Sequence, residues 1–215
     1  MIPFHDMPAF QAAIEKEWNS WLEYQSCEVL SLQDSQKVEQ ECPKRILPSR
    51  FVLRNKHAGL VGADGTPLPL KAKAKLCLAG HLCPDSLSGE IQVDSPTVER
   101  VSTMYFLHMV ISMGWLTNWF IGDMSNAFLQ GAPLQGKVMY MRQPRQGLPG
   151  LKKGQIMRLI KSVYGRPDAP RAWFNELARV PKDELGFVQS GVDPAMFHMR
   201  DEAGKLCGLL STLMI

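Results

Sequence analysis

The chain has 215 residues, of which 45% are hydrophobic and 21% are charged, and its formal net charge is +3. This composition is ordinary for a folded globular protein and excludes a largely disordered chain. The apolar stretches are too short and too interrupted to cross a bilayer, and the first ten residues lack the basic and apolar regions of a secretory signal.

The N-terminal half predicts one helix followed by two strands. Apolar residues recur at helical spacing within residues 8–31, which predicts an amphipathic helix. Strands are expected at 50–58 and 70–81, joined by the turn-forming residues 62–69. Basic and apolar residues alternate in the second strand, so its lysines share one half-exposed face; they are Lys71, Lys73 and Lys75.

The middle of the chain predicts a buried helix and then a buried strand. Residues 98–115 are apolar and rich in methionine, which predicts a buried helix that ends near Gly114. The apolar run 115–121 follows as a strand that closes at Asp123. Residues 83–96 are expected to form a loop.

The C-terminal part predicts short strands around one more helix. Strands are expected at 137–144 and within 155–165, on either side of a glycine-rich turn. Residues 168–180 predict a helix with Asp168 as its N-cap, which Pro181 stops or kinks. A hairpin closes the sequence, with strands at 195–200 and 205–215 joined by Asp-Glu-Ala-Gly. This order of elements indicates an α+β fold.

Charge is distributed unevenly along the chain. Residues 1–42 hold eight acids and two basic residues, whereas residues 44–75 hold eight basic residues and one acid. Residues 137–179 hold ten basic residues and two acids. Two such basic blocks fit either a polyanionic partner or ordinary solvated surfaces.

The cysteines indicate a reduced protein. The five cysteines are odd in number and form no CxxC pair. This pattern fits an intracellular, reducing compartment better than a disulfide framework, and it leaves cytoplasm and nucleus open. His81 and Cys83 could form half of a zinc site, but two incidental loop residues explain them better because no second half is visible.

Asp123 is the main candidate for chemistry. A carboxylate at the end of a buried strand is a good ligand for Mg²⁺, which prefers oxygen ligands and bridges carboxylates to phosphates. The alternative is that Asp123 caps the short helical turn that begins at Met124. The residues alone leave both interpretations open.

Several blocks in order resemble one known family. They are "DMSNAFLQG", "VMYMRQP", "KSVYGRPDAPRAWFNEL" and "GFVQSGVDPAMFHMRD". At this spacing they resemble the reverse transcriptase domain of copia-type (Ty1/copia) retrotransposon polyproteins. The family pattern around the first acid is close to Asp-Val-Lys-Thr-Ala-Phe-Leu-Asn-Gly, and the later block is close to Tyr-Gly-Leu-Lys-Gln-Ala-Pro-Arg-Ala-Trp. The resemblance covers nearly the whole chain and implies a right-hand polymerase fold.

The resemblance implies a role for individual residues. Asp123 matches the first of three catalytic carboxylates that bind two Mg²⁺ ions. Phe128 matches an aromatic steric gate that excludes a 2′-hydroxyl, although a core aromatic is the alternative. Tyr164 and Gly165 match a turn that lines the nucleotide and template pocket.

Further positions of the resemblance concern phosphate contacts. Lys73 and Lys75 match a triphosphate-binding position in the fingers, with Lys75 in place of an arginine, so bidentate contact is lost. Arg171 could contact template phosphate or lie on the surface. Trp173 is better explained by helix packing.

The chain departs from the family pattern at its end. The pattern continues with Val-Asp-Asp, which supplies the other two carboxylates, but no Asp or Glu follows Glu202 here. Either the chain is cut before the acidic pair or the pair is deleted. The resemblance thus implies an incomplete palm without a thumb, with residues 1–57 leading into the fingers, 58–100 forming fingers strands and 101–215 forming a partial palm.

Three functions follow as hypotheses. The first is a fragment of a reverse transcriptase, an RNA-directed DNA polymerase that acts on a primer–template and deoxynucleoside triphosphates and is inactive alone. The second is a non-enzymatic, nucleic-acid-binding relic of the same fold. The third, an unrelated α+β binding domain, is disfavoured by the matching blocks. The resemblance also implies that the chain is part of a polyprotein and acts away from membranes.

Overall fold

The computed structural model describes residues 6–119, 121–134 and 136–211, and the structural statements below refer to these residues. The strands are β1 (Cys27–Val29), β2 (Ile46–Leu47), β3 (Ser49–Asn55), β4 (Ala72–Leu78), β5 (Tyr140–Arg142), β6 (Ile156–Leu159), β7 (Val188–Gln189), β8 (Met196–Arg200) and β9 (Leu206–Ser211). The α-helices are α1 (Met7–Glu23), α2 (Leu32–Glu41), α3 (Pro84–Leu87), α4 (Arg100–Ser112) and α5 (Ala169–Arg179). Short 3-10 helices are η2 (Pro43–Arg45), η3 (Gly80–Leu82) and η4 (Ala127–Gln130), and η5 (Val180–Glu184) is a π-helix.

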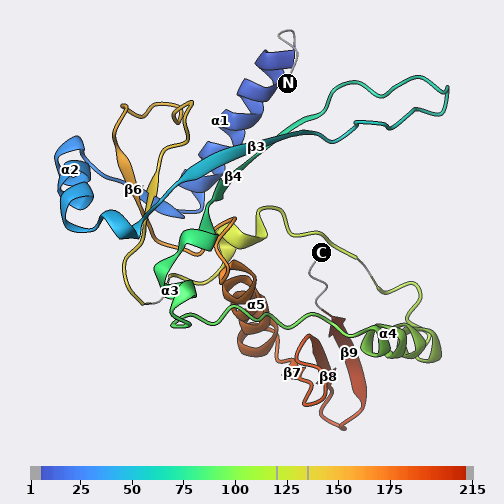
Figure 1. Cartoon of the computed structure of the whole chain (residues 1–215). Coiled ribbons are helices and arrows are strands. Elements are labelled where there is room, and N and C mark those ends of the chain that lie inside the picture. Colours follow the sequence, from blue (N-terminus) through green and yellow to red (C-terminus); the bar gives the residue numbers. More distant parts are fainter. Residues whose placement is uncertain (1–5, 120, 135, 212–215) are drawn as a thin grey trace.

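The strands form three separate sheets (Figure 1). A four-stranded sheet has the order β1-β6-β5-β2, with β2 parallel to β5 and the other pairs antiparallel. β3 and β4 form a long antiparallel hairpin, and β7-β8-β9 form an antiparallel sheet. This mixture of helices and mainly antiparallel strands confirms the expected α+β class.

The apolar interior is divided into two clusters. The larger one joins α1, the β3–β4 hairpin and the four-stranded sheet; its most buried large side chains include Trp18, Trp21, Leu76, Met141 and Met157. The smaller one joins α5 to the C-terminal sheet through Phe174, Ala178, Ala195 and Phe197. The larger cluster therefore ties α1 to strands that are distant in sequence, and the smaller one ties α5 to the strands that follow it.

The N-terminal helix is shorter than expected. The prediction of one helix over 8–31 is wrong, because α1 ends at Glu23 and Gln25 adopts a left-handed conformation with φ of 51°. The next residues pair with β6 as β1, and a second helix starts at Ser31, whose Oγ accepts a hydrogen bond from the Asp34 backbone amide at 3.0 Å. Pairing with a distant strand thus overrides the helical periodicity.

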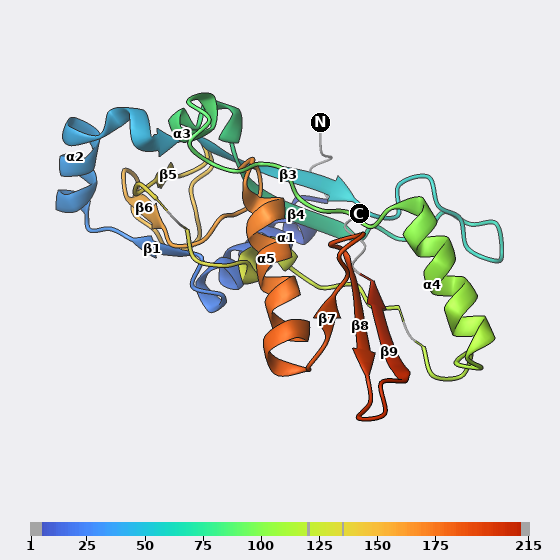
Figure 2. The same cartoon turned by 90° about the horizontal axis from the view of Figure 1, so that it is seen from below.

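The central segment differs most from the prediction. A helix, α4, does form, but most of its apolar side chains are exposed and only Val110 is buried. In both views α4 lies apart from the larger core (Figures 1 and 2), and its contacts include β9 and Asp193, which accepts a hydrogen bond from the Glu99 backbone amide at its start. The predicted burial is therefore wrong for this part of the structure, since few neighbouring elements cover the helix.

Asp123 does not end a strand. Residues 115–119 and 121–123 form turns and irregular backbone, so the predicted strand is absent there. A strand is stable only when it pairs with others, and the described residues offer this segment no pairing strand.

The C-terminal elements agree well with the sequence. The helix at 169–179, its change to a π-helix at Pro181 and the β8–β9 hairpin are confirmed. Asp168 occupies the N-cap position of α5, but its side chain makes no cap hydrogen bond. Residues 212–215 of the predicted last strand lie outside the described residues.

Two glycines allow a close backbone approach between β4 and the turn before α5. The Leu78 backbone amide donates a 2.8 Å hydrogen bond to the Tyr164 carbonyl. A Cβ on Gly165 would lie 2.2 Å from the Leu78 carbonyl oxygen, and one on Gly80 would lie 1.9 Å from the Gly165 oxygen. Gly165 also has φ of +92°, which side chains rarely adopt. Only glycine fits at this contact.

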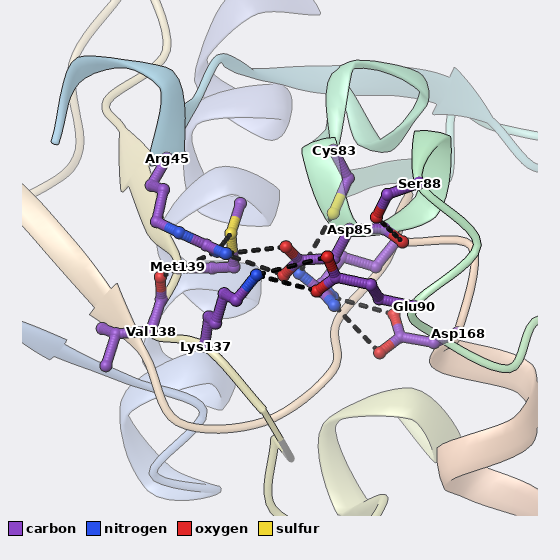
Figure 3. A network of polar contacts seen from close by, with 10 residues as sticks. Arg45, Cys83, Asp85, Ser88, Glu90, Lys137, Val138, Met139 and Asp168 are labelled. Atoms are coloured by element: carbon purple, nitrogen blue, oxygen red, sulfur yellow. Dashed lines mark hydrogen bonds and ion pairs between the residues drawn. The ribbon is translucent and has the colours of Figure 1, made fainter.

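Two ion pairs hold the segment after β4 in place (Figure 3). Arg45 donates to both Asp85 oxygens, at 3.1 and 2.6 Å. Arg166, which is 3% exposed, donates to both Asp168 oxygens at 2.8 and 2.9 Å and approaches Cys83 Sγ at 3.9 Å. Arg166 and Asp168 occupy the positions of Leu and Gln in the pattern that the chain resembles, so the two departures form one buried pair.

All five cysteines are free, in agreement with the expected absence of a disulfide framework. Burial raises the pKa of the Cys27 thiol to about 12, which keeps it protonated and unreactive. Among the helices that the structure describes, none is long and apolar enough to span a membrane.

Gly165→Ala should lower the free energy of unfolding by about 3 kcal/mol or more, because the new Cβ collides with rigid backbone at an unfavourable φ. Gly150→Ala is the matched control, since Gly150 also has a positive φ but has open space around its Cβ. It should cost about 1 kcal/mol, from backbone strain alone. Urea unfolding of both variants tests this, and equal losses would contradict the steric argument.

Asp168→Asn should destabilise the chain by about 3 kcal/mol, because it leaves the buried Arg166 charge unpaired. Replacing both partners, with Arg166→Leu and Asp168→Gln, should recover most of that loss. Glu28→Gln is the control: Glu28 pairs with Arg158 at 2.6 Å on an exposed surface, so it should cost less than about 1 kcal/mol. Thermal or urea unfolding provides the measurement, and a double variant as unstable as the single one would refute the pairing.

Candidate functional site

Lys75 lies at the centre of a polar and aromatic cluster that joins four parts of the chain. Its Nζ is 3.7 Å from Glu17 Oε2 on α1 and 3.2 Å from Asn126 Oδ1, to which it donates a hydrogen bond. The same Nζ lies 3.8 Å from the centroid of the Tyr164 ring, a cation–π contact. A carboxylate, an amide and an aromatic face therefore surround the ammonium group.

The local electrostatics reflect this enclosure. Burial lowers the pKa of Lys75, while the nearby Glu17 carboxylate acts in the opposite direction. The Lys75 side chain is still 23% exposed, so the ammonium is not sealed off from solvent. A cation in this position can reach an anion that arrives from outside.

An aromatic pair forms one wall beside Lys75. The rings of Phe128, on η4, and Tyr164 have centroids 5.2 Å apart and are tilted by 57°, a favourable arrangement. Burial raises the pKa of Tyr164 above its usual value, and Glu17, Cys77 and Asp123 add to this effect. The phenol therefore stays protonated.

A left-handed residue sets the position of this wall. Asn126 has φ of 54° and directly precedes η4, whose Leu129 amide donates to the Asn126 carbonyl at 2.9 Å. Asn tolerates this conformation better than most residues. Because of this turn, the Asn126 side chain meets Lys75 while Asp123, three residues earlier, remains exposed.

The structure separates the candidate residues into three places. Lys75, Phe128, Tyr164 and Gly165 come together, and the charge of the exposed Asp123 contributes to the raised pKa of Tyr164. Lys73 lies farther along the hairpin, opposite Arg54, where the two line a cavity of about 260 Å³.

Arg171 lies elsewhere, on α5. Its Nη1 is 3.7 Å from Asp94, and it lines a different cavity, of about 430 Å³. Trp173, on the same helix, is buried, which agrees with a packing role.

Two members of the cluster were not singled out from the sequence. Glu17 is 6% exposed. The sequence feature that could have indicated its burial is the position of an acidic residue on the apolar face of a helix, between Ile14 and Trp21. Asn126 lies in the turn after Asp123, but only its left-handed backbone and its contact with Lys75 reveal it.

The donor set fits a Mg²⁺ ion only in part. Mg²⁺ keeps several waters and takes one or two carboxylates together with substrate phosphates. Asp123 supplies one exposed carboxylate. Within residues 6–119, 121–134 and 136–211, no three or more His, Cys, Asp or Glu side chains lie close enough together to hold a metal ion. His81 and Cys83 are therefore not part of such a group there.

Several known proteins are similar to this sequence. Residues 38–212 match the family model described as reverse transcriptase (RNA-dependent DNA polymerase). The chain is 36% identical over 106 residues to the retrovirus-related Pol polyprotein from transposon RE2 of Arabidopsis thaliana, and 32% identical over 106 residues to that from transposon RE1 of the same plant. Each match covers 49% of this chain and 7% of the relative.

A third relative covers more of the chain. The Pol polyprotein from transposon TNT 1-94 of Nicotiana tabacum is 27% identical over 163 residues, which is 76% of this chain and 11% of the relative. No solved structure matches the chain. The matches thus span about a tenth or less of these polyproteins. Because the family model covers most of the length of the chain, the chain belongs to the reverse transcriptase (RNA-dependent DNA polymerase) family in its copia-like form.

Proposed function

We propose that the chain forms the fingers and part of the palm of a copia-like reverse transcriptase, with residues 1–57 leading into the fingers, 58–100 in the fingers and 101–215 in a partial palm. The observation that carries this proposal is the cluster in which Lys75, Phe128 and Tyr164 meet; the exposed carboxylate of Asp123 acts electrostatically on Tyr164. A cation, an aromatic wall and an exposed carboxylate are what a deoxynucleoside triphosphate with Mg²⁺ requires.

Each residue has a role in this proposal. Asp123 would hold Mg²⁺, which lowers the pKa of an attacking 3′-hydroxyl and stabilises the leaving pyrophosphate. Lys73 and Lys75 bind the triphosphate, and Tyr164 with Gly165 lines the base and template side. The Phe128 ring is half-buried against Tyr164, so it is held firmly enough to exclude a 2′-hydroxyl by contact. Arg171 would contact template phosphate if Asp94 releases it.

This chain alone is proposed to be catalytically incomplete. Two metal ions in line need more than one carboxylate, and the sequence has no Asp or Glu after Glu202. A complete two-metal site would need the two further carboxylates of the family pattern, which this sequence does not contain after Glu202.

A second candidate function, nucleic-acid binding without catalysis, is favoured by the β3–β4 hairpin. Arg54 lies directly opposite Lys73, and Arg50 lies on the same face as Lys75. Like charges opposite each other in a sheet are unfavourable unless an anion lies between or above them. A nucleic-acid backbone would supply that anion, so this face suits template or primer phosphates.

The purified chain should show no primer extension above background on an RNA or DNA template with Mg²⁺ and all four deoxynucleoside triphosphates. The reason is that one carboxylate cannot position two metal ions. Gel analysis of a labelled primer measures this. Mg²⁺-dependent extension that Asp123→Asn abolishes would show that the site is complete after all.

The chain should bind a primer–template duplex with an affinity that falls as salt rises, because lysines and arginines displace counterions from phosphates. Lys73→Gln should weaken binding at every sequence and reduce the slope of log affinity against log salt by about one. Lys37→Gln is the control, since Lys37 is exposed on α2 and pairs with Glu41 at 4.0 Å. Fluorescence anisotropy at several salt concentrations tests this. An affinity that does not change with salt concentration would contradict both nucleic-acid functions.

A further inference from the structure

The buried carboxylate of Glu17 is an unusual feature of α1. Glu17 is only 6% exposed, on a helix face that it shares with Trp18 and Trp21. A buried carboxylate is costly unless it is paired and hydrogen-bonded. Glu17 precedes residues 38–212, the range of the family match, so that match says nothing about it.

Both oxygens of Glu17 are engaged. Oε1 accepts hydrogen bonds from the Leu76 backbone amide at 3.1 Å and from Trp21 Nε1 at 3.3 Å. Oε2 lies 3.7 Å from Lys75 Nζ. The carboxylate is therefore fixed by its own helix and by β4, while its second oxygen faces the lysine of the candidate nucleotide site.

Lys75 is held by three contacts, and part of its side chain remains exposed to solvent. Glu17, Asn126 and the Tyr164 ring contact its ammonium, and 23% of its side chain remains exposed. The other charged or titratable groups that act on Lys75 are Lys73 and Cys77 of β4, while Cys77, Tyr24 and Asp123 act on its neighbour Tyr164. Glu17 is the buried anion among these groups.

We propose that Glu17 is a positioning residue for triphosphate binding: it keeps the Lys75 ammonium charged and oriented toward the open side of the cluster, without itself touching the nucleotide. This inference rests on the proposed nucleotide site. In this proposal α1 contributes to that site through Glu17, although α1 lies far from Asp123 and Phe128 in sequence.

Glu17→Gln separates positioning from simple packing. The glutamine carbonyl can still accept from the Leu76 amide and Trp21, so the fold is preserved, but the negative charge beside Lys75 is gone. Burial already lowers the pKa of Lys75 and Glu17 counteracts this, so removing Glu17 should lower that pKa further. Lys75 would then lose its proton, and its attraction for phosphate, at a lower pH.

The test measures the affinity of deoxythymidine triphosphate with Mg²⁺ for the full chain between pH 7 and pH 10, by calorimetry. Glu17→Gln should weaken binding about three- to tenfold at pH 8.5 and move the alkaline loss of affinity to lower pH by about half a unit or more. Glu15→Gln is the matched control, because Glu15 is exposed on the same helix and contacts only Gln11 in the described chain, at 3.4 Å. It should behave like the wild type.

A second measurement does not depend on nucleotide. NMR titration of the Lys75 side chain, assigned with Lys75→Arg, should show proton loss at a lower pH in Glu17→Gln than in the wild type or Glu15→Gln. Thermal unfolding of each variant shows whether the fold persists.

The outcomes distinguish this inference from the proposed function. If the wild type binds the triphosphate and Glu17→Gln matches it at every pH, or Lys75 titrates unchanged, the positioning role is wrong while the nucleotide site stands. If the wild type binds no triphosphate, the proposed site is wrong and this inference is overturned with it. Weaker binding by Glu17→Gln with an unchanged pH profile would also overturn it, since a packing defect alone would then explain the loss.

Discussion

The candidate site depends on the close backbone contact between the end of β4 and the turn before α5. Gly80 and Gly165 leave no room for a Cβ there, and the Leu78 amide is hydrogen-bonded to the Tyr164 carbonyl. This contact fixes the position of the Tyr164 backbone along β4, and the Tyr164 ring therefore lies against Lys75. Two glycines and one hydrogen bond thus join the β3–β4 hairpin to the segment that leads into α5.

Buried polar groups around this contact are paired rather than isolated. Arg45 with Asp85 and Arg166 with Asp168 hold the chain on either side of Cys83, while Glu17 joins α1 to Lys75. A buried ion pair adds little net stability, but any arrangement that separates the partners is strongly destabilised, because it leaves an uncompensated buried charge. Their role here is to fix which segments meet, and the apolar cluster around Trp18 and Trp21 supplies the burial.

The two parts of the proposed active site are organised to different degrees. Lys75, Tyr164 and Phe128 are held by contacts from several elements, whereas Asp123 is exposed in an irregular segment that follows a poorly covered helix. The lysine and aromatic part of the proposed site is thus held within this chain, while the proposed metal ligand Asp123 lies on an exposed, irregular segment. This asymmetry agrees with a chain that spans a small part of its polyprotein relatives.

The sequence by itself determined the α+β class, the β3–β4 and β8–β9 hairpins, α5, and the family, because alternation, turn chemistry and ordered motifs are local signals. It also identified Lys75, Phe128, Tyr164 and Gly165, which the structure brings together. Local periodicity failed where distant pairing decides the outcome: residues 27–29 join a sheet instead of a helix, and 115–119 lack a partner strand.

Only the tertiary structure decided which residues complete the site. Glu17 is a helical acid in the sequence, Asn126 an ordinary turn residue, and Arg166 a departure from a pattern. Glu17 and Asn126 join the cluster through distant contacts with Lys75, and Arg166 pairs locally with Asp168 while it approaches the distant Cys83. The pKa values of these side chains depend on burial and on the distance between charges from remote segments. Neither quantity can be calculated from the spacing of residues along the sequence.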